Sequence, residues 1–80
     1  MHIESLVRMA NDIGAFFASE PQADQAANGV LTHIKRYWDP RMRAQIVAHY
    51  RSSGGEGMAP HVSAAIAKLA ADSPATERKA

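Results

Sequence analysis

The sequence predicts an all-α fold in which four helices form one small domain. Large apolar residues recur every three or four positions in four separate segments, as they do along one face of a helix. Prolines and glycines lie between these segments, where helices begin and end. No segment shows the apolar and polar alternation of a strand. We therefore expect residues 1–71 to form a single helical domain.

The first helix is expected to begin near Ile3, because large apolar residues recur every three or four positions from Ile3 to Ala18. Its apolar stripe consists of Ile3, Leu6, Met9, Ile13, Phe16 and Phe17. Pro21 disfavours helical backbone at the residue before it. The helix should therefore end near Ser19 or Glu20, and a short turn should follow.

The second helix is expected from about Asp24 to Tyr37. Its periodic positions are Ala23, Ala27, Val30, Leu31, Ile34 and Trp38. Gly29 lies inside this helix and weakens it mildly, because glycine loses more backbone freedom than other residues. Because the apolar spacing continues on both sides of Gly29, we still expect one helix here.

The third helix has the clearest start signal in the chain, the pair Asp39-Pro40. Aspartate is a favoured N-cap, and proline is tolerated at the first helical position, where its missing N–H is not needed. The apolar residues of this helix are Met42, Ile46, Val47 and Tyr50. The run 52–55, Ser-Ser-Gly-Gly, should end the helix, because glycine adopts a left-handed cap easily.

A fourth, short helix is expected to start at Pro60, after the loop residues 57–59. Its apolar face consists of Val62, Ile66 and Leu69. After Ala71 the sequence has no large apolar side chain that could pack. We therefore expect residues 72–80 to form a disordered tail.

The size of the chain favours association with a partner. A single core in a domain of 80 residues rarely contributes more than roughly 3–5 kcal/mol, so small proteins add disulfides, a metal or a partner. The chain has no cysteine, which excludes disulfides, thiolate metal sites and cysteine nucleophiles. The first residues lack the pattern of a secretory signal, and no apolar run approaches the ~20 residues of a membrane span. A cytoplasmic protein is expected.

Charge is distributed unevenly along the chain, although the net charge is only +1. Residues 1–24 carry four carboxylates and one arginine, or −3, and residues 33–51 carry five cations and one carboxylate, or +4. Such an asymmetry favours oriented docking on a partner.

Motifs for chemistry are weak. The four histidines, at positions 2, 33, 49 and 61, form no pair at the helical spacings that metal sites use. The glycines at 54, 55 and 57 follow a helix and not a strand, so they indicate a connector and not a phosphate loop. We predict no catalytic, cofactor-binding or metal-binding residue.

Residues 35–43 are the most promising binding segment, because nine residues contain four cations and two aromatic side chains. Trp38 could close the core while the arginines face solvent. Trp38, Arg41 and Arg43 could instead anchor a protein interface, as Trp and Arg often do. The arginines could also contact nucleic acid phosphates, but a pI of 8.2 and the acidic first helix argue against this.

The first helix offers a second candidate surface. Phe16 and Phe17 are adjacent and point about 100° apart, so both cannot face the centre of one core. Either one of them meets a partner, or the fold packs this helix on two sides. The predicted partner-binding residues are Arg8, Phe17, Arg36, Trp38, Arg41 and Arg43.

Three segments also carry a family resemblance: residues 6–17, residues 33–43 and residues 57–60. Together they resemble the delta subunit of cytoplasmic NAD-dependent formate dehydrogenases, over most of residues 3–70. The run 38–43, Trp-Asp-Pro-Arg-Met-Arg, is especially specific. Met58 departs from the family pattern, in which leucine is expected.

The resemblance implies a non-catalytic small subunit of a complex that oxidises formate to carbon dioxide and reduces NAD. Molybdopterin guanine dinucleotide, iron–sulfur clusters and FMN would lie in the larger subunits, and none of them in this chain. The expected partner is the molybdenum-bearing catalytic (alpha) subunit, which the small subunit would stabilise or help to assemble. A transient factor for insertion of the molybdenum cofactor and a helix-turn-helix nucleic-acid binder stay open as alternatives, and the isolated chain is expected to be able to form a homodimer.

Overall fold

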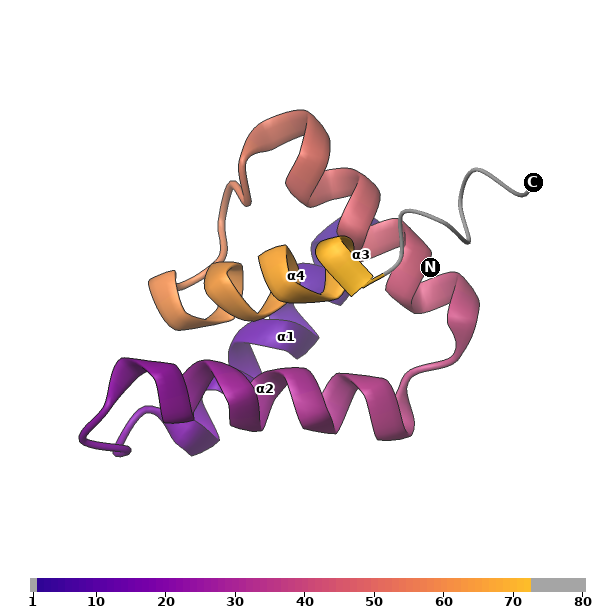
Figure 1. Ribbon diagram of the computed structural model, residues 1–80. Helices are drawn as coiled ribbons and strands as arrows, with labels where there is room; N and C mark the ends of the chain where they lie inside the picture. The colour runs from indigo at the N-terminus through magenta and orange to yellow at the C-terminus, as the bar shows by residue number, and fades with distance from the viewer. Residues whose placement is uncertain (1, 73–80) are drawn as a thin grey trace.

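A computed structural model describes residues 2–72, and this part of the chain folds into four helices, which confirms the all-α prediction. The helices are α1 (Ile3–Phe17), α2 (Ala23–Tyr37), α3 (Pro40–Ser53) and α4 (Pro60–Asp72), as Figure 1 shows. α4 includes Asp72, the first residue of the predicted tail. The rest of that predicted tail, residues 73–80, lies outside the described residues.

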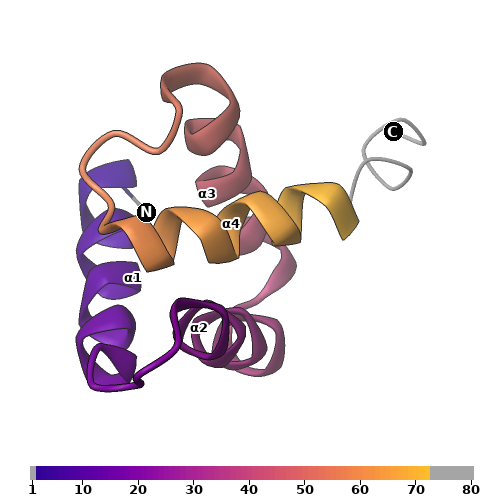
Figure 2. The same ribbon diagram turned by 60° about the vertical axis from the view of Figure 1, so that its left-hand side comes forward.

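The helices pack around α4, which contacts each of the other three. In Figure 2, α4 crosses the molecule in front, with α1 on one side, α2 below and α3 above. α1 also packs against α2 and α3. Because α4 is surrounded in this way, its apolar positions are buried on several sides, and they include alanines as well as larger residues.

The core consists of aliphatic side chains from all four helices. The largest fully buried residues are Leu6, Val30, Ile34, Ile46, Val47, Val62 and Ile66. Trp38 closes this core at the corner between α2 and α3 and is only 5% exposed. Within residues 2–72 no polar or charged residue is buried, so the core is stabilised by apolar burial alone.

The ends of α3 follow the predicted signals. The Asp39 carboxylate accepts a hydrogen bond of 3.0 Å from the backbone N–H of Met42, and Pro40 occupies the first turn. Gly54 follows the last turn with a φ of 73°, and its N–H donates to the carbonyl of Tyr50. This is the left-handed glycine cap expected from the sequence.

α1 and α4 approach each other closely at Gly14. A Cβ on Gly14 would clash with Cγ2 of Val62 and would lie 3.0 Å from Nε2 of His61. The absent side chain therefore allows the first turn of α4 to lie directly on the backbone of α1. Nε2 of His61 lies 2.8 Å from the carbonyl oxygen of Gly14, so this ring nitrogen donates to a carbonyl at the C-terminal end of α1.

The connector between α3 and α4 is held by Asn11 of α1. The side-chain amide of Asn11 donates to the carbonyl of Gly57 at 2.9 Å, and its carbonyl accepts from the N–H of Ala59 at 3.0 Å. Gly57 has a φ of 88°, a backbone conformation that suits glycine. Asn11 thus fixes the chain just before α4 begins.

Candidate functional site

Trp38 lies in the core and offers almost no surface to a partner. Its side chain is 5% exposed and packs within the buried cluster. Of the sequence-based alternatives for this residue, the one in which Trp38 closes the core describes its position. The Trp38 ring has a large apolar area and lies at the corner between α2 and α3. It therefore covers the end of the core there.

Arg43 is engaged with its own chain. Its guanidinium donates to the carbonyl of Trp38 and, at 3.4 Å, to the carbonyl of Lys35. Both carbonyls lie at the C-terminal end of α2, where helices leave backbone acceptors without intrahelical partners and where positive charge is favourable. The position of Arg43 is therefore that of a cap on α2, and only part of its side chain is exposed.

Phe17 also packs inside the fold, whereas its neighbour Phe16 faces outwards. A Cβ on Gly29 would lie 2.5 Å from the ring of Phe17, so this ring lies directly against the backbone of α2 at Gly29. Phe16 is 78% exposed, and the two rings meet edge to face with centroids 5.0 Å apart. The sequence singled out Phe17, but the exposed member of the pair is Phe16.

The other three predicted arginines are exposed, and each lies on a different helix: Arg8 on α1, Arg36 on α2 and Arg41 on α3. Within residues 2–72 none of the three forms a hydrogen bond or an ion pair. Lys35, which completes the basic corner, pairs with Asp72 at 2.7 Å. Lys35 and Arg43, two of the four cations in residues 35–43, therefore bind groups of the same chain.

Arg36 is the predicted residue that the structure brings next to exposed aromatic side chains. It lines a shallow groove of about 460 Å³, here called the α1–α2 groove. The groove is lined by Phe17, Asn28, Gly29, Thr32, His33, Arg36 and Tyr37. Apart from Phe17, these residues come from α2, at the spacing of its solvent-facing side.

Aromatic side chains mark both ends of the α1–α2 groove. At one end, Phe17 forms part of the lining and supports the exposed ring of Phe16. At the other end, Tyr37 is 69% exposed and its ring contacts His33 at a tilt of 45°, with centroids 4.7 Å apart. Phe16 and Tyr37 are the exposed large hydrophobic residues among those described.

Sequence reasoning did not select His33 or Tyr37 as binding residues. The available signal was the second face of α2, because residues 29, 32, 33 and 36 recur at helical spacing on the side away from the buried Val30 and Ile34. Tyr37 lies next on this face, and its large ring is exposed and not packed in the core. An aromatic residue on the polar side of an amphipathic helix is the pattern that could have indicated the groove.

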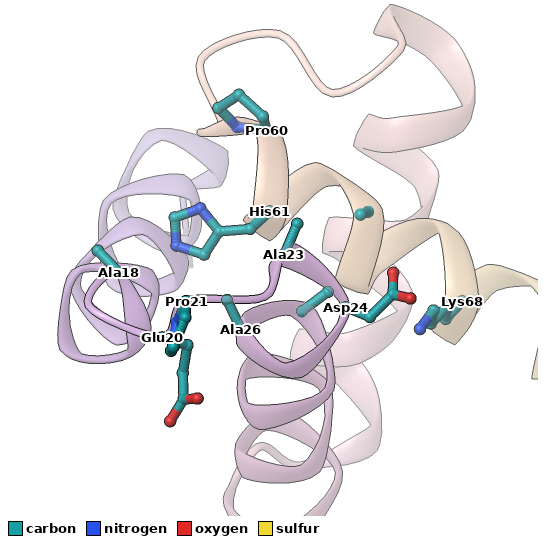
Figure 3. Close-up of a pocket in the computed structure, with 11 residues that line it drawn as sticks. Ala18, Glu20, Pro21, Ala23, Asp24, Ala26, Pro60, His61 and Lys68 are labelled. Carbon is teal, nitrogen blue, oxygen red and sulfur yellow. The ribbon is translucent and has the colours of Figure 1, made fainter.

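A second hollow lies where the α1–α2 turn meets the first turns of α4, and Figure 3 shows its lining. It measures about 410 Å³ and is lined largely by alanines and prolines, with Glu20, Asp24, His61 and Lys68. Two of these polar groups have partners in the fold: His61 donates to Gly14, and Lys68 donates to Asn28 at 2.9 Å. The two basic side chains of this hollow are therefore bound to other groups of the same chain.

No metal-binding cluster and no membrane-spanning helix are found in the part of the chain that the structure describes. Within residues 2–72, no three His, Asp or Glu side chains are grouped so that they could hold a metal ion. No helix there is both long enough and apolar enough to cross a bilayer.

Comparison with known proteins gives one match. The sequence model of a family described as the NADH-dependent formate dehydrogenase delta subunit FdsD matches residues 5–66. No curated protein and no solved structure matches the chain. The matched segment runs from α1 into α4 and includes every residue that lines the α1–α2 groove.

Proposed function

The chain belongs to the delta-subunit family of NADH-dependent formate dehydrogenase, and from this premise we propose that it is a non-catalytic subunit that binds the catalytic (alpha) subunit. Binding would stabilise the alpha subunit or assist its assembly. The observation that carries this proposal is the α1–α2 groove, where an uncommitted arginine and the exposed ring of Tyr37 form part of the lining, and the exposed ring of Phe16 packs on Phe17 of the same lining. Aromatic residues and arginine are the side chains most often responsible for the affinity of protein interfaces.

The residues of this chain do not fit the cofactors of such a complex. Iron–sulfur clusters need cysteine thiolates, and the sequence contains no cysteine. The described residues contain no grouping of metal-binding side chains. We therefore propose that the iron–sulfur clusters lie in the other subunits, together with the molybdenum cofactor and FMN that the family resemblance assigns to them.

The surface proposed for docking keeps three of the residues predicted from the sequence and adds two. Arg8, Arg36 and Arg41 are retained because they are exposed and have no partner within residues 2–72. Phe16 and Tyr37 are added because their rings are exposed. Trp38, Arg43 and Phe17 would act indirectly, by holding the helices that present this surface.

The proposal is tested by co-expressing the alpha subunit with and without this chain. We expect the two chains to co-purify in a fixed ratio, and the formate-dependent reduction of NAD by the assembled enzyme to decay faster on warming when the chain is omitted. A substoichiometric amount in the active enzyme, with the molybdenum content lowered when the chain is absent, would indicate a transient maturation factor instead. Absence of any association would overturn both roles.

A further inference from the structure

We propose that the α1–α2 groove receives a protein segment of the catalytic subunit in which a carboxylate lies between apolar side chains. This inference rests on the proposed docking of the chain on that subunit, and it identifies the surface and the chemistry of the contact. The carboxylate would pair with Arg36, and the apolar side chains would cover the rings of Phe16 and Tyr37.

The charge of the groove indicates the anionic group. Arg36 is the one residue with a full charge in its lining, and it has no partner within residues 2–72. Neighbouring cations are already used, since Lys35 pairs with Asp72 and Arg43 caps α2. A guanidinium binds a carboxylate through two parallel hydrogen bonds, which gives both strength and orientation. A carboxylate is therefore the complementary group.

The rings at the two ends indicate the apolar part of the ligand. Phe16 is 78% and Tyr37 69% exposed, so both rings leave most of their apolar area in water. Phe17 supports Phe16 and His33 supports Tyr37, so each exposed ring is held by a neighbour before a partner binds. Such pre-ordered rings lose little side-chain freedom on binding.

The length of the groove sets the size of the segment. Eight residues separate Gly29, where Phe17 lies on α2, from Tyr37 at the end of that helix. At 1.5 Å per residue this is about 12 Å, or roughly two helical turns. At the Gly29 end, the ring of Phe17 fills the space beside the glycine and closes the groove.

A second copy of the chain is a poorer occupant by the same argument. Two grooves facing each other would bring two Arg36 side chains into one interface, and the lining contains no carboxylate to neutralise them. The like charges would repel, whereas a partner segment with a carboxylate removes the unpaired charge.

The test is the affinity of the full-length chain for the catalytic subunit, measured at constant salt with groove variants. We expect Arg36→Glu to raise the dissociation constant at least ~30-fold, and Phe16→Ala and Tyr37→Ala to raise it about 5-fold or more each. The double variant Gln22→Glu/Gln25→Glu is the matched control, because it makes the same net charge change of two units at exposed residues outside the groove. Each variant is also checked for its helix content and its thermal unfolding.

The chemistry of the partner is tested with Arg36→Lys and a water-soluble carbodiimide. This reagent activates a carboxylate, and a nearby lysine amine then displaces the urea to form an amide bond. We expect a cross-link that is absent with the wild-type chain, joined to an aspartate or glutamate of the catalytic subunit that has apolar neighbours.

The outcomes separate this inference from the proposed function. If the wild-type chain does not bind the catalytic subunit, the proposed function fails. If the wild-type chain binds and the folded groove variants bind with the same affinity, the groove is not the docking site, and the proposed function stands. A new cross-link to a second copy of this chain would overturn the inference in favour of self-association.

Discussion

At the scale of single residues, side chains that look alike in the sequence have different positions in the structure. Arg41 and Arg43 are two residues apart, yet Arg41 is exposed while Arg43 donates to backbone carbonyls at the end of α2. Tyr37 and Trp38 are adjacent, yet one is 69% and the other 5% exposed. The helix ends at Tyr37, and this change of backbone direction turns Trp38 into the core.

Arg43→Ala should destabilise the free chain, because it leaves carbonyls at the C-terminus of α2 without their donor. We expect the free energy of unfolding to fall by roughly 1–2 kcal/mol. Urea denaturation followed by circular dichroism measures this change. Arg41→Ala is the control and should stay within about 0.5 kcal/mol of the wild type. Equal effects would show that Arg43 does not act as a cap.

Asn11→Ala should also be costly, because one side chain makes both hydrogen bonds that hold the connector to α1. Loss of a half-buried polar pair of this kind costs about 1–3 kcal/mol. The neighbouring substitution Asp12→Ala removes an exposed side chain and should cost less than about 0.5 kcal/mol. Thermal unfolding of both variants measures this loss of stability. A smaller loss for Asn11→Ala than for Asp12→Ala would show that Asn11 does not hold the connector.

At the scale of helices, close packing depends on two glycines in helix interiors. Gly14 allows α4 to lie on α1, and Gly29 allows the ring of Phe17 to lie on α2. From sequence alone Gly29 was only a weakening residue, because a helical pattern does not show which neighbour approaches it. The tertiary structure gives the reason for both residues: a methyl group would occupy space that another element fills.

The two glycines should respond differently to alanine. Alanine gains up to about 1 kcal/mol of helix propensity at either position. At Gly14 the new Cβ meets the buried side chain of Val62, and overpacking of this kind costs about 1–3 kcal/mol, so Gly14→Ala should be net destabilising. At Gly29 it meets the ring of Phe17, which is only half-buried and therefore shifts more easily than the fully buried Val62.

We therefore expect Gly29→Ala to lower the free energy of unfolding by less than Gly14→Ala does. Its effect should appear in the near-ultraviolet circular dichroism of the aromatic side chains, because Phe17 moves. Denaturant unfolding compares the two variants directly. A Gly14→Ala chain at least as stable as the wild type would contradict the close contact between α1 and α4.

At the scale of the whole molecule, the core is so small that the loss of one large buried side chain can unfold the chain. Removing a buried tryptophan costs about 3–5 kcal/mol, which is similar to the roughly 3–5 kcal/mol that a core of this size contributes. A variant that combines Trp38→Ala with arginine substitutions would therefore unfold the chain and could not report on docking. Residues with exposed side chains, such as Phe16 and Arg36, are the appropriate probes.

Trp38→Ala should abolish the cooperative thermal transition of the free chain, whereas Tyr37→Ala should leave it nearly unchanged. The reason is burial, because Trp38 lies in the core and Tyr37 lies at the surface. Circular dichroism at 222 nm during heating measures both. A cooperative transition at the wild-type temperature for Trp38→Ala would show that the ring is not part of the core.

The sequence by itself determined the helices and the family. The pair Asp39-Pro40 marks the first residue of α3, and the predicted stop at 52–55 contains its last residue, because caps and periodicity act within a few positions of the chain. The resemblance in residues 6–17 and 33–43 indicated the delta-subunit family, and the family match over residues 5–66 confirms it.

Only the tertiary structure decided which side chains are exposed. It placed Trp38 in the core, bonded Arg43 to the carbonyl of Trp38 at the end of α2, and left Phe16 more exposed than Phe17. Each outcome depends on atoms that are distant in the sequence or on the direction in which a helix ends. Local propensity carries no information about such contacts, because exposure is a property of the packed molecule and not of the segment.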